Sequence, residues 1–222
     1  MHLGLGLPQE DIQMIKAAVF DLGGVLFSEG KERAADELVR QYGYDRDLIL
    51  KVFVSPGSVD LRKGFITNDE FWDGARGELP GGYDVSRIQE AWHKGYILDK
   101  DIHRLIQTLK GQYKIIAFSD NTRDRIDFLE NQYGFRKLFD LEVYSFEHGL
   151  SKQDKRFTEL MIRESGCEPT ELVYVDDDKE KVAAARELGV NVLVYRAGHA
   201  GELTAGLRRL DIIFREGSNE SC

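Results

Sequence analysis

The sequence contains only two cysteines and no long hydrophobic run. Cys167 and Cys222 lie far apart in a chain of 222 residues and show neither metal-ligand spacing nor a paired framework. No uninterrupted apolar stretch approaches the roughly 18 residues that a membrane-spanning helix needs. The N-terminal stretch MHLGLGLPQE lacks the basic start and the long apolar core of a secretory signal. We therefore expect a protein of a reducing, cytoplasmic setting with no membrane partner.

The sequence also has a deficit of positive charge. Its 30 Lys and Arg residues face 39 Asp and Glu residues, which gives a formal net charge of -9 at pH 7. Such a balance disfavours a polyanionic partner, so we expect no binding to nucleic acid. With 42% hydrophobic residues, a chain of this length can bury one main core and a modest accessory domain. Both a monomer and a homodimer are compatible with the sequence.

Short apolar runs rich in β-branched residues alternate with segments of helical periodicity. This pattern is typical of βαβ units around a parallel sheet, and it predicts an α/β fold. Within residues 178–189, Val182, Ala185 and Leu188 recur at helical spacing before Gly189, which predicts a helix. The expected strands span residues 16–20, 113–118, 141–145, 171–175 and 190–195.

Residues 30–98 show a different pattern. They read as several amphipathic helices without a convincing strand, and they are too many for an ordinary loop between a strand and a helix. Thr67 and Glu70 have the spacing of a capping box, which predicts that a helix begins there. The apolar residues Phe71 and Trp72 that follow are expected to serve packing. We predict a helical insertion after the first strand that acts as a lid over the strand ends.

Polar side chains follow several expected strands, at the point where each strand ends. An isolated aspartate there is most often a helix cap or turn residue, and this ordinary explanation is kept for Asp178. In a parallel sheet, however, the carboxyl ends of different strands meet at one crevice, so the other polar groups are expected to form one site. They are Asp21, the stretch Ser119, Asp120 and Asn121, the loop residue Lys152, and the pair Asp176 and Asp177.

The chemistry of these residue types is that of phosphoryl transfer. Asp21 and the acidic pair at 176–177 would repel one another unless a cation lay between them, and carboxylate oxygens suit Mg²⁺. A carboxylate oxygen can attack phosphorus to form an aspartyl-phosphate. Lys152, Ser119, the metal and backbone N–H groups would then hold the phosphoryl oxygens. The residues predict transfer of a phosphoryl group to Asp21, followed by hydrolysis.

Four motifs, in this order, resemble those of the haloacid dehalogenase-like (HAD) superfamily. FDLGGVL is similar to its first motif, IIAFSDN to its second, GLSKQDKRF to its third and LVYVDDDKEKVAAARELG to its fourth. The resemblance implies a Rossmann-like three-layer core with a parallel sheet in the order 5-4-1-2-3 and a helical C1 cap inserted after the first strand. The core is expected at residues 12–28 and 100–215, and the cap at residues 29–99. FITNDEFW in the cap resembles the subgroup of sugar-phosphate phosphatases and the phosphatase domain of soluble epoxide hydrolases.

The resemblance also implies a role for each site residue. Asp21 is expected to be the nucleophile, Ser119 to bind the phosphoryl group, and Lys152 to orient Asp21 and neutralise charge. The implied function is a Mg²⁺-dependent phosphatase that acts on a small phosphorylated metabolite such as a sugar phosphate. The expected metal site comprises Asp21, the main-chain carbonyl of Gly23, Asp176 and Asp177, with the direct ligand of the acidic pair left open. The expected phosphate site comprises Gly24, Ser119, Asp120, Asn121 and Lys152.

Three positions depart from the family pattern. Gln153 replaces the usual proline after Lys152, which changes loop stiffness more than chemistry. Asp120 stands where many members have Asn, which adds negative charge and makes Asn121 a substitute contact. Gly23 stands where many of these phosphatases carry the Asp that acts as general acid and base, a role typically worth about 10²–10⁴ in rate.

The glycine at position 23 leads to two hypotheses. Either the substrates have good leaving groups, such as anomeric sugar 1-phosphates, aryl phosphates or acyl phosphates, or another side chain supplies the acid. Glu147 and His148 in the loop of the third motif, and His93 in the inserted region, are the candidates for that acid.

Two other functions compete with the phosphatase. A 2-haloacid dehalogenase would use Asp21 to displace halide from carbon and needs no proton donor, which fits Gly23. Such chemistry also needs no cation, which leaves Asp176 and Asp177 without a purpose. A catalytically impaired binding protein with the HAD fold is favoured by Gly23 alone, and the retained polar residues argue against it.

The sequence does not identify the substrate. Specificity in this superfamily resides largely in the cap, and the stretch ELPGGYDVSRIQEAWHKGYILDK names no ligand. Arg123 and Arg125 begin a helix after the second expected strand, where they either reach an anionic substrate or are solvated. Both ends of the chain, residues 1–10 and 217–222, are expected to be mobile.

Overall fold

A computed structural model describes residues 14–215. Five strands form one sheet in which all neighbours run parallel, in the order β3-β2-β1-β4-β5. Read from its other edge, this is the order 5-4-1-2-3, so the predicted topology is confirmed. The two chain ends, and residues 12 and 13 of the expected core, lie outside the described residues. The strands are β1 (Ala17–Phe20), β2 (Lys114–Ser119), β3 (Leu141–Tyr144), β4 (Leu172–Asp176) and β5 (Asn191–Val194).

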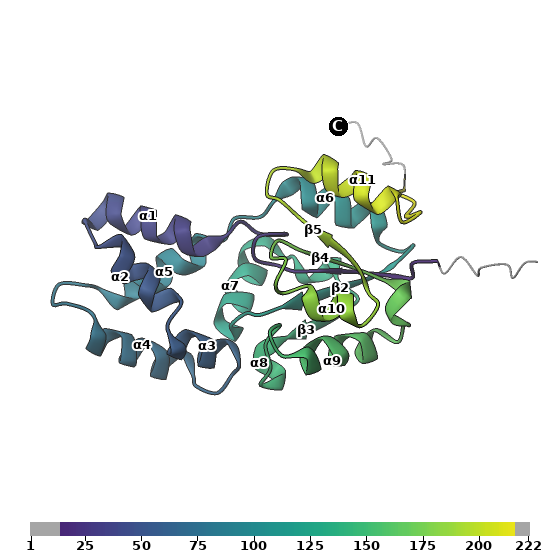
Figure 1. Cartoon of the computed structure of the whole chain (residues 1–222). Helices are drawn as coiled ribbons and strands as arrows, with labels where there is room; N and C mark the ends of the chain where they lie inside the picture. Colours follow the sequence, from purple (N-terminus) through teal and green to yellow (C-terminus); the bar gives the residue numbers. More distant parts are fainter. Residues whose placement is uncertain (1–13, 216–222) are drawn as a thin grey trace, which may run out of the picture.

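Helices cover both faces of the sheet, which gives the core three layers (Figure 1). Because side chains alternate along a strand, Ala18 and Phe20 pack with α6, α7 and α11, whereas Ala17 and Val19 pack with α9 and α10. Burial on both faces explains why the strands read as continuous apolar runs. The helices of this part are α6 (Lys100–Leu109), α7 (Arg123–Tyr133), α8 (Ser145–His148), α9 (Lys155–Ser165), α10 (Ala183–Glu187) and α11 (Ala200–Arg208), with 3₁₀ turns at Arg136–Leu138 and Pro169–Glu171.

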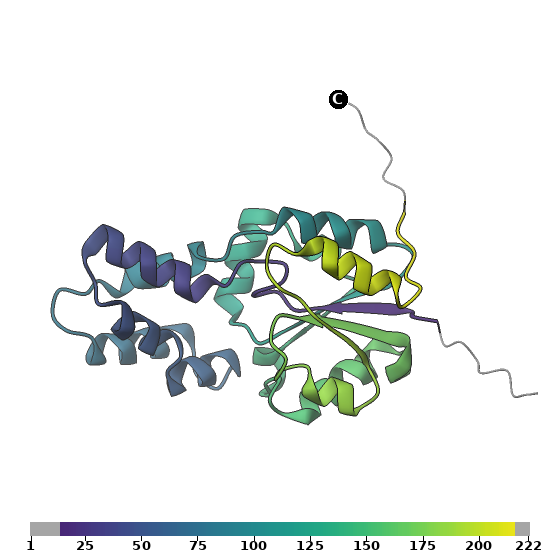
Figure 2. The same ribbon diagram turned by 45° about the horizontal axis from the view of Figure 1, so that its top comes forward.

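Five helices lie between β1 and α6 and form a cluster beyond the carboxyl ends of the strands (Figures 1 and 2). The chain enters and leaves this insertion along two paired segments, because Ser28 N donates to Ile97 O and Asp99 N donates to Leu26 O, both at 2.8 Å. The pairing falls at the expected limits of the cap, and the division into two domains stays a prediction. The inserted helices are α1 (Gly30–Tyr42), α2 (Arg46–Phe53), α3 (Pro56–Arg62), α4 (Asn68–Glu78) and α5 (Val85–Lys94).

The predicted helix start at Thr67 is confirmed. The Thr67 hydroxyl accepts from Glu70 N (3.2 Å), and the Glu70 carboxylate accepts from Thr67 N (2.7 Å), which closes the capping box of α4. Phe71 and Trp72 are buried against Trp92 within the insertion, so their expected packing role is confirmed as well. Among the helices that the structure describes, none has the length and apolar character needed to cross a membrane.

The helix expected over residues 178–189 begins later than its pattern predicted. The chain first forms a turn in which the Asp178 carboxylate accepts a hydrogen bond from Glu180 N (2.8 Å), and α10 follows at Ala183–Glu187. Asp178 is therefore a capping residue, in agreement with the ordinary explanation of its position.

Candidate active site

Three polar residues come together at the carboxyl edge of the sheet. β1 lies between β2 and β4, and the Asp21 N–H continues the ladder by donating to Val175 O (2.9 Å). Asp21 therefore lies level with Asp176, the last residue of β4, and one position before the level of Ser119, the last residue of β2. All three are at most 3% exposed, so their side chains meet in a desolvated environment.

Lys152 reaches this edge from the loop after α8. Its ammonium lies 2.9 Å from Asp21 Oδ1 and 2.7 Å from Asp176 Oδ2. The loop is fixed by Asp120, whose carboxylate accepts from Lys152 N (3.1 Å). Burial lowers the pKa of Lys152, but the carboxylates of Asp176 and Asp21 outweigh it and raise the pKa above its ordinary value. The ammonium therefore stays charged between the two carboxylates.

Asp177 adds a third carboxylate to the cluster. Asp21, Asp176 and Asp177 each offer one oxygen, and these oxygens lie within 4.8 Å of one another. The two oxygens of Asp176 already accept three hydrogen bonds, from two side chains and one main-chain N–H. In contrast, Oδ1 of Asp177 is buried and accepts no hydrogen bond from any residue in the described range. Asp177 thus has an oxygen available for a ligand.

The electrostatics of the cluster favour a bound cation. Burial, followed by repulsion from Asp21, raises the pKa of Asp177 to about 7. Burial would also raise the pKa of Asp176, but the Lys152 ammonium outweighs it and holds this pKa at about 2. A divalent cation beside Asp177 would offset the repulsion, and an all-oxygen donor set suits a hard ion. The three carboxylates therefore form a candidate metal centre.

Two glycines let the chain turn closely against this cluster. Gly24 has a φ of +79°, and a Cβ at this position would lie 2.0 Å from Asp177 Oδ2. Gly24 therefore lets the turn pass close to Asp177, and its expected contact with phosphate stays a prediction. A Cβ at Gly23 would lie 3.4 Å from Tyr96 Cε1, which is an ordinary contact. Position 23 consequently tolerates a side chain far better than position 24.

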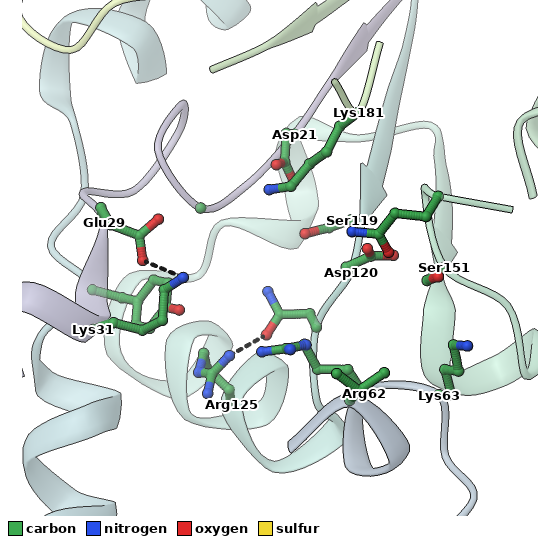
Figure 3. A pocket seen from close by; sticks show the side chains of 15 residues that line it. Asp21, Glu29, Lys31, Arg62, Lys63, Ser119, Asp120, Arg125, Ser151 and Lys181 are labelled. Carbon is green, nitrogen blue, oxygen red and sulfur yellow. Dashed lines mark hydrogen bonds and ion pairs between the residues drawn. The ribbon is translucent and has the colours of Figure 1, made fainter. Parts of the chain in front are cut away.

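A pocket opens in front of Asp21, between the sheet edge and the inserted helices (Figure 3). Residues 119–121 line it, as expected for a phosphate site, and so does Lys181, which was not among the expected site residues. Burial lowers the pKa of Lys181, but the nearby carboxylates, that of Asp21 first, raise it above its ordinary value. The stretch DDDKEK carried the signal, because Lys181 follows the acidic pair by about one helical turn.

Two residues of the expected phosphate site also fix neighbouring segments. The Asp120 carboxylate is engaged with Lys152 N, and burial raises its pKa. Asn121 Oδ1 accepts from Thr122 N (3.0 Å) and from Arg125 Nη1 (3.2 Å). Both side chains line the pocket, but their oxygens are occupied by these protein donors.

The structure does not place the candidate substitute acids in this pocket. Glu147 and His148 are exposed on α8, and His93 Nε2 lies 2.9 Å from a carboxylate oxygen on α7. Tyr96, which was not among the expected site residues, lies beside Gly23 and lines the pocket. Burial raises the pKa of the Tyr96 phenol, so its hydroxyl carries a proton at neutral pH.

The two arginines at the start of α7 differ in their surroundings. Arg123 is exposed, and its guanidinium stacks over the Phe146 ring at 4.7 Å from the centroid. Arg125 is 2% exposed and lines the pocket. The two arginines were expected either to reach a substrate or to be solvated. Arg123 is solvated, whereas Arg125 is not.

The fold and the site together define a class of α/β proteins. In this class an aspartate after the first strand, a lysine and an acidic pair meet at the carboxyl edge of a parallel sheet, beneath inserted helices. The sequence pattern of the haloacid dehalogenase-like hydrolases matches residues 15–189, and the chain belongs to this family. The resemblance inferred from the four motifs is thus confirmed.

Three similar proteins illustrate the range of the family. An uncharacterized protein of Dictyostelium discoideum is 38% identical over 219 residues, which cover 85% of this chain and 94% of that protein. D-ribitol-5-phosphate phosphatase of Bacteroides thetaiotaomicron is 26% identical over 187 residues, with 79% of this chain and 89% of that protein covered. The fold is shared with a HAD family enzyme of the same bacterium in complex with magnesium and inorganic phosphate, at a TM-score of 0.72, 24% identity, and coverage of 83% of this chain and 96% of that chain.

Proposed function

We propose that the protein is a Mg²⁺-dependent phosphatase that hydrolyses a small phosphorylated metabolite through a phosphoryl-enzyme on Asp21. The observation that carries the proposal is the buried contact of Asp21 with Lys152 next to the unpartnered Asp177 oxygen, at the end of a polar pocket. Support comes from a relative that is a sugar-alcohol phosphate phosphatase, and from a similarly folded enzyme in complex with magnesium and inorganic phosphate.

The oxygen donors fit Mg²⁺. Asp21 and Asp177 would supply carboxylate oxygens, and the main-chain carbonyl of Gly23 would complete the protein ligands. Asp176 would hold Lys152 through Oδ2 and add negative charge, and the choice of Asp177 as the direct ligand of the acidic pair rests on its unpartnered Oδ1. When bound, Mg²⁺ supplies positive charge that polarises the phosphoryl group and offsets the charge of the transition state.

Asp21 is arranged to attack phosphorus through one oxygen. Its Oδ1 accepts from Leu22 N (2.7 Å) and contacts the Lys152 ammonium, which fixes the carboxylate and leaves Oδ2 free. Attack by Oδ2 forms the O–P bond while the bond from phosphorus to the leaving oxygen breaks. The Lys152 ammonium and the Ser119 hydroxyl stabilise the phosphoryl oxygens. Water then attacks phosphorus, which releases inorganic phosphate and restores the Asp21 carboxylate.

The departing oxygen receives no proton from position 23, because Gly23 has no side chain. We therefore expect kcat/KM to fall steeply as the leaving group becomes more basic, by at least about tenfold between p-nitrophenyl phosphate and phenyl phosphate. Steady-state kinetics with a series of aryl phosphates would measure this slope. A flat dependence that becomes steep in Tyr96→Phe would contradict the expectation and assign the missing proton to Tyr96.

Metal dependence tests the proposal directly. Chelation with EDTA is expected to abolish hydrolysis of p-nitrophenyl phosphate, and added Mg²⁺ to restore it. Asp177→Asn is expected to raise the half-saturating Mg²⁺ concentration at least about tenfold, because it removes a charged ligand. Asp178→Asn is the matched control, since Asp178 only caps a turn, and it should keep the wild-type value. Equal activity with and without Mg²⁺ would sink the proposal.

The two alternatives make different predictions in the same assays. A 2-haloacid dehalogenase would release halide from a haloacid without Mg²⁺, and the unpartnered Asp177 oxygen has no purpose in that reaction. An impaired binding protein would hydrolyse p-nitrophenyl phosphate no faster than its Asp21→Asn variant. Metal-dependent hydrolysis that needs Asp21 excludes the impaired protein, and halide release without Mg²⁺ would favour the dehalogenase.

A further inference from the structure

Arg125 is buried in the wall of the active-site pocket with unused hydrogen-bond donors. Its guanidinium carbon lies 4.2 Å from the centroid of the Trp92 ring and 4.7 Å from that of Tyr96. Nη1 donates to Asn121 Oδ1, whereas Nε and Nη2 donate to no residue within 14–215. Stacking satisfies the faces of the guanidinium, but its in-plane N–H groups need an oxygen acceptor. The side chain is therefore incomplete without a further partner.

A second arginine faces the first. Arg62, at the end of α3, lines the same pocket, and Figure 3 shows it pointing toward Arg125 on the side opposite Asp21 and Lys181. In the described part of the chain, neither arginine lies within ion-pair distance of a carboxylate. Burial, followed by the charge of Arg125, lowers the pKa of Arg62. Two like charges are thus held together in a partly buried place, and the carboxylates of Asp120 and Glu29 act on Arg62 only from beyond ion-pair distance.

None of the described carboxylates that line the pocket reaches either arginine. Glu29 lies 3.7 Å from Lys31, as the dashed line in Figure 3 marks, and its Oε1 accepts no hydrogen bond in the described range, whereas Asp120 accepts from Lys152 N. Asp21 contacts the Lys152 ammonium. A buried guanidinium that lacks its counterion is unfavourable, and an anion that enters the pocket would satisfy the arginines.

We propose that Arg62 and Arg125 bind a second anionic group of the substrate while its first phosphate reacts at Asp21. This inference rests on the proposed function and names its substrate class, a small phosphate monoester that carries a second oxyanion, either carboxylate or phosphate. A guanidinium binds such a group through two parallel hydrogen bonds, whereas a neutral hydroxyl accepts fewer and no charge is neutralised. Because Arg62 belongs to the insertion and Arg125 to α7, the second anion would also draw these two parts together.

Three aryl phosphates test the proposal, because they share a similar phenol leaving group and differ only at the far end of a short side chain on the ring. The far end is a hydroxyl, a carboxylate or a second phosphate. With Mg²⁺ present, kcat/KM for at least one anion-ended ester is expected to exceed that of the hydroxyl-ended ester at least about tenfold. The two anion-ended esters compared with each other distinguish a carboxylate from a phosphate as the natural group.

Variants of the two arginines test whether the preference for anion-ended esters depends on these side chains. Arg125→Met and Arg62→Met are each expected to reduce the ratio of kcat/KM between anion-ended and hydroxyl-ended esters to within about threefold of unity. Arg123→Met is the matched control, since Arg123 lies on the same helix outside the pocket and should keep the wild-type ratio. If Arg125→Met does not fold, the proposal is still tested by comparing the ratio of kcat/KM in Arg62→Met with the ratio in the wild-type protein.

The outcomes separate this inference from the function on which it rests. Metal-dependent hydrolysis of p-nitrophenyl phosphate without a preference for the anion-ended esters overturns the second-anion site and leaves the phosphatase intact. A preference that survives in both arginine variants overturns the assignment of the site to these residues. Absence of any metal-dependent hydrolysis overturns the proposed function, and this inference with it.

Discussion

Replacing Asp21 by Asn is expected to lower kcat for p-nitrophenyl phosphate at saturating Mg²⁺ by at least about 10³-fold. An amide oxygen carries no negative charge and is a poor nucleophile toward phosphorus. The substitution conserves shape, and Lys152 keeps its partner Asp176 at 2.7 Å, so the fold is expected to persist. Steady-state kinetics, together with thermal unfolding of both proteins, would separate lost chemistry from lost structure.

The control for this loss is the same substitution at Asp178, which lies outside the pocket and should retain full activity. Because an asparagine can deamidate back to aspartate, Asp21→Ala serves as a second variant. A kcat within about tenfold of wild type in both Asp21 variants would contradict the account, since removal of a covalent nucleophile costs far more than that.

Gly24→Ala is expected to weaken the binding of Mg²⁺ and to destabilise the fold. A methyl group at this position would lie 2.0 Å from Asp177 Oδ2, so the carboxylate must leave the cluster or the turn must open. The positive φ of +79° adds a strain of about 1–2 kcal/mol for any side chain. We expect the half-saturating Mg²⁺ concentration to rise at least about tenfold and the free energy of unfolding to fall.

Gly198→Ala separates the backbone strain at a positive φ from the collision with Asp177. Gly198 has almost the same φ, +78°, but a Cβ there would meet no atom within 4 Å among the described residues. Its substitution should cost a similar strain energy and leave the Mg²⁺ dependence unchanged. If both variants weaken the binding of Mg²⁺ equally, the collision with Asp177 is not the cause, and the assignment of Asp177 as a ligand would be wrong.

The sheet and its polar edge could be predicted because both depend on local sequence and on strand geometry. Burial on two faces imposes continuous apolar runs, and parallel pairing aligns the strand ends, so the residues after β1, β2 and β4 must converge. The order of the four motifs then identified the family. Even the capping box at Thr67 is a local signal, complete within four residues.

The rest of the pocket depends on contacts that no local pattern encodes. Arg62 and Tyr96 reach the site only because the inserted helices pack over the strand ends, and Arg125 is buried by the same packing. In the loop after β3, α8 ends at Gly149 with a φ of +67°, and the turn leaves His148 exposed while Lys152 points inward. Nearness to Lys152 in the sequence therefore suggested acids that the structure leaves exposed, outside the lining of the pocket.

The most direct test of the account is to find the phosphoryl group on Asp21. Because Gly23 supplies no base to activate water, the phosphoryl-enzyme is expected to accumulate during turnover. The protein would be mixed with p-nitrophenyl phosphate and Mg²⁺, quenched in acid, digested and examined by mass spectrometry. The account predicts the added mass of one phosphoryl group on Asp21, absent without Mg²⁺. Rapid hydrolysis with no phosphorylated Asp21, or with the group on another residue, would contradict it.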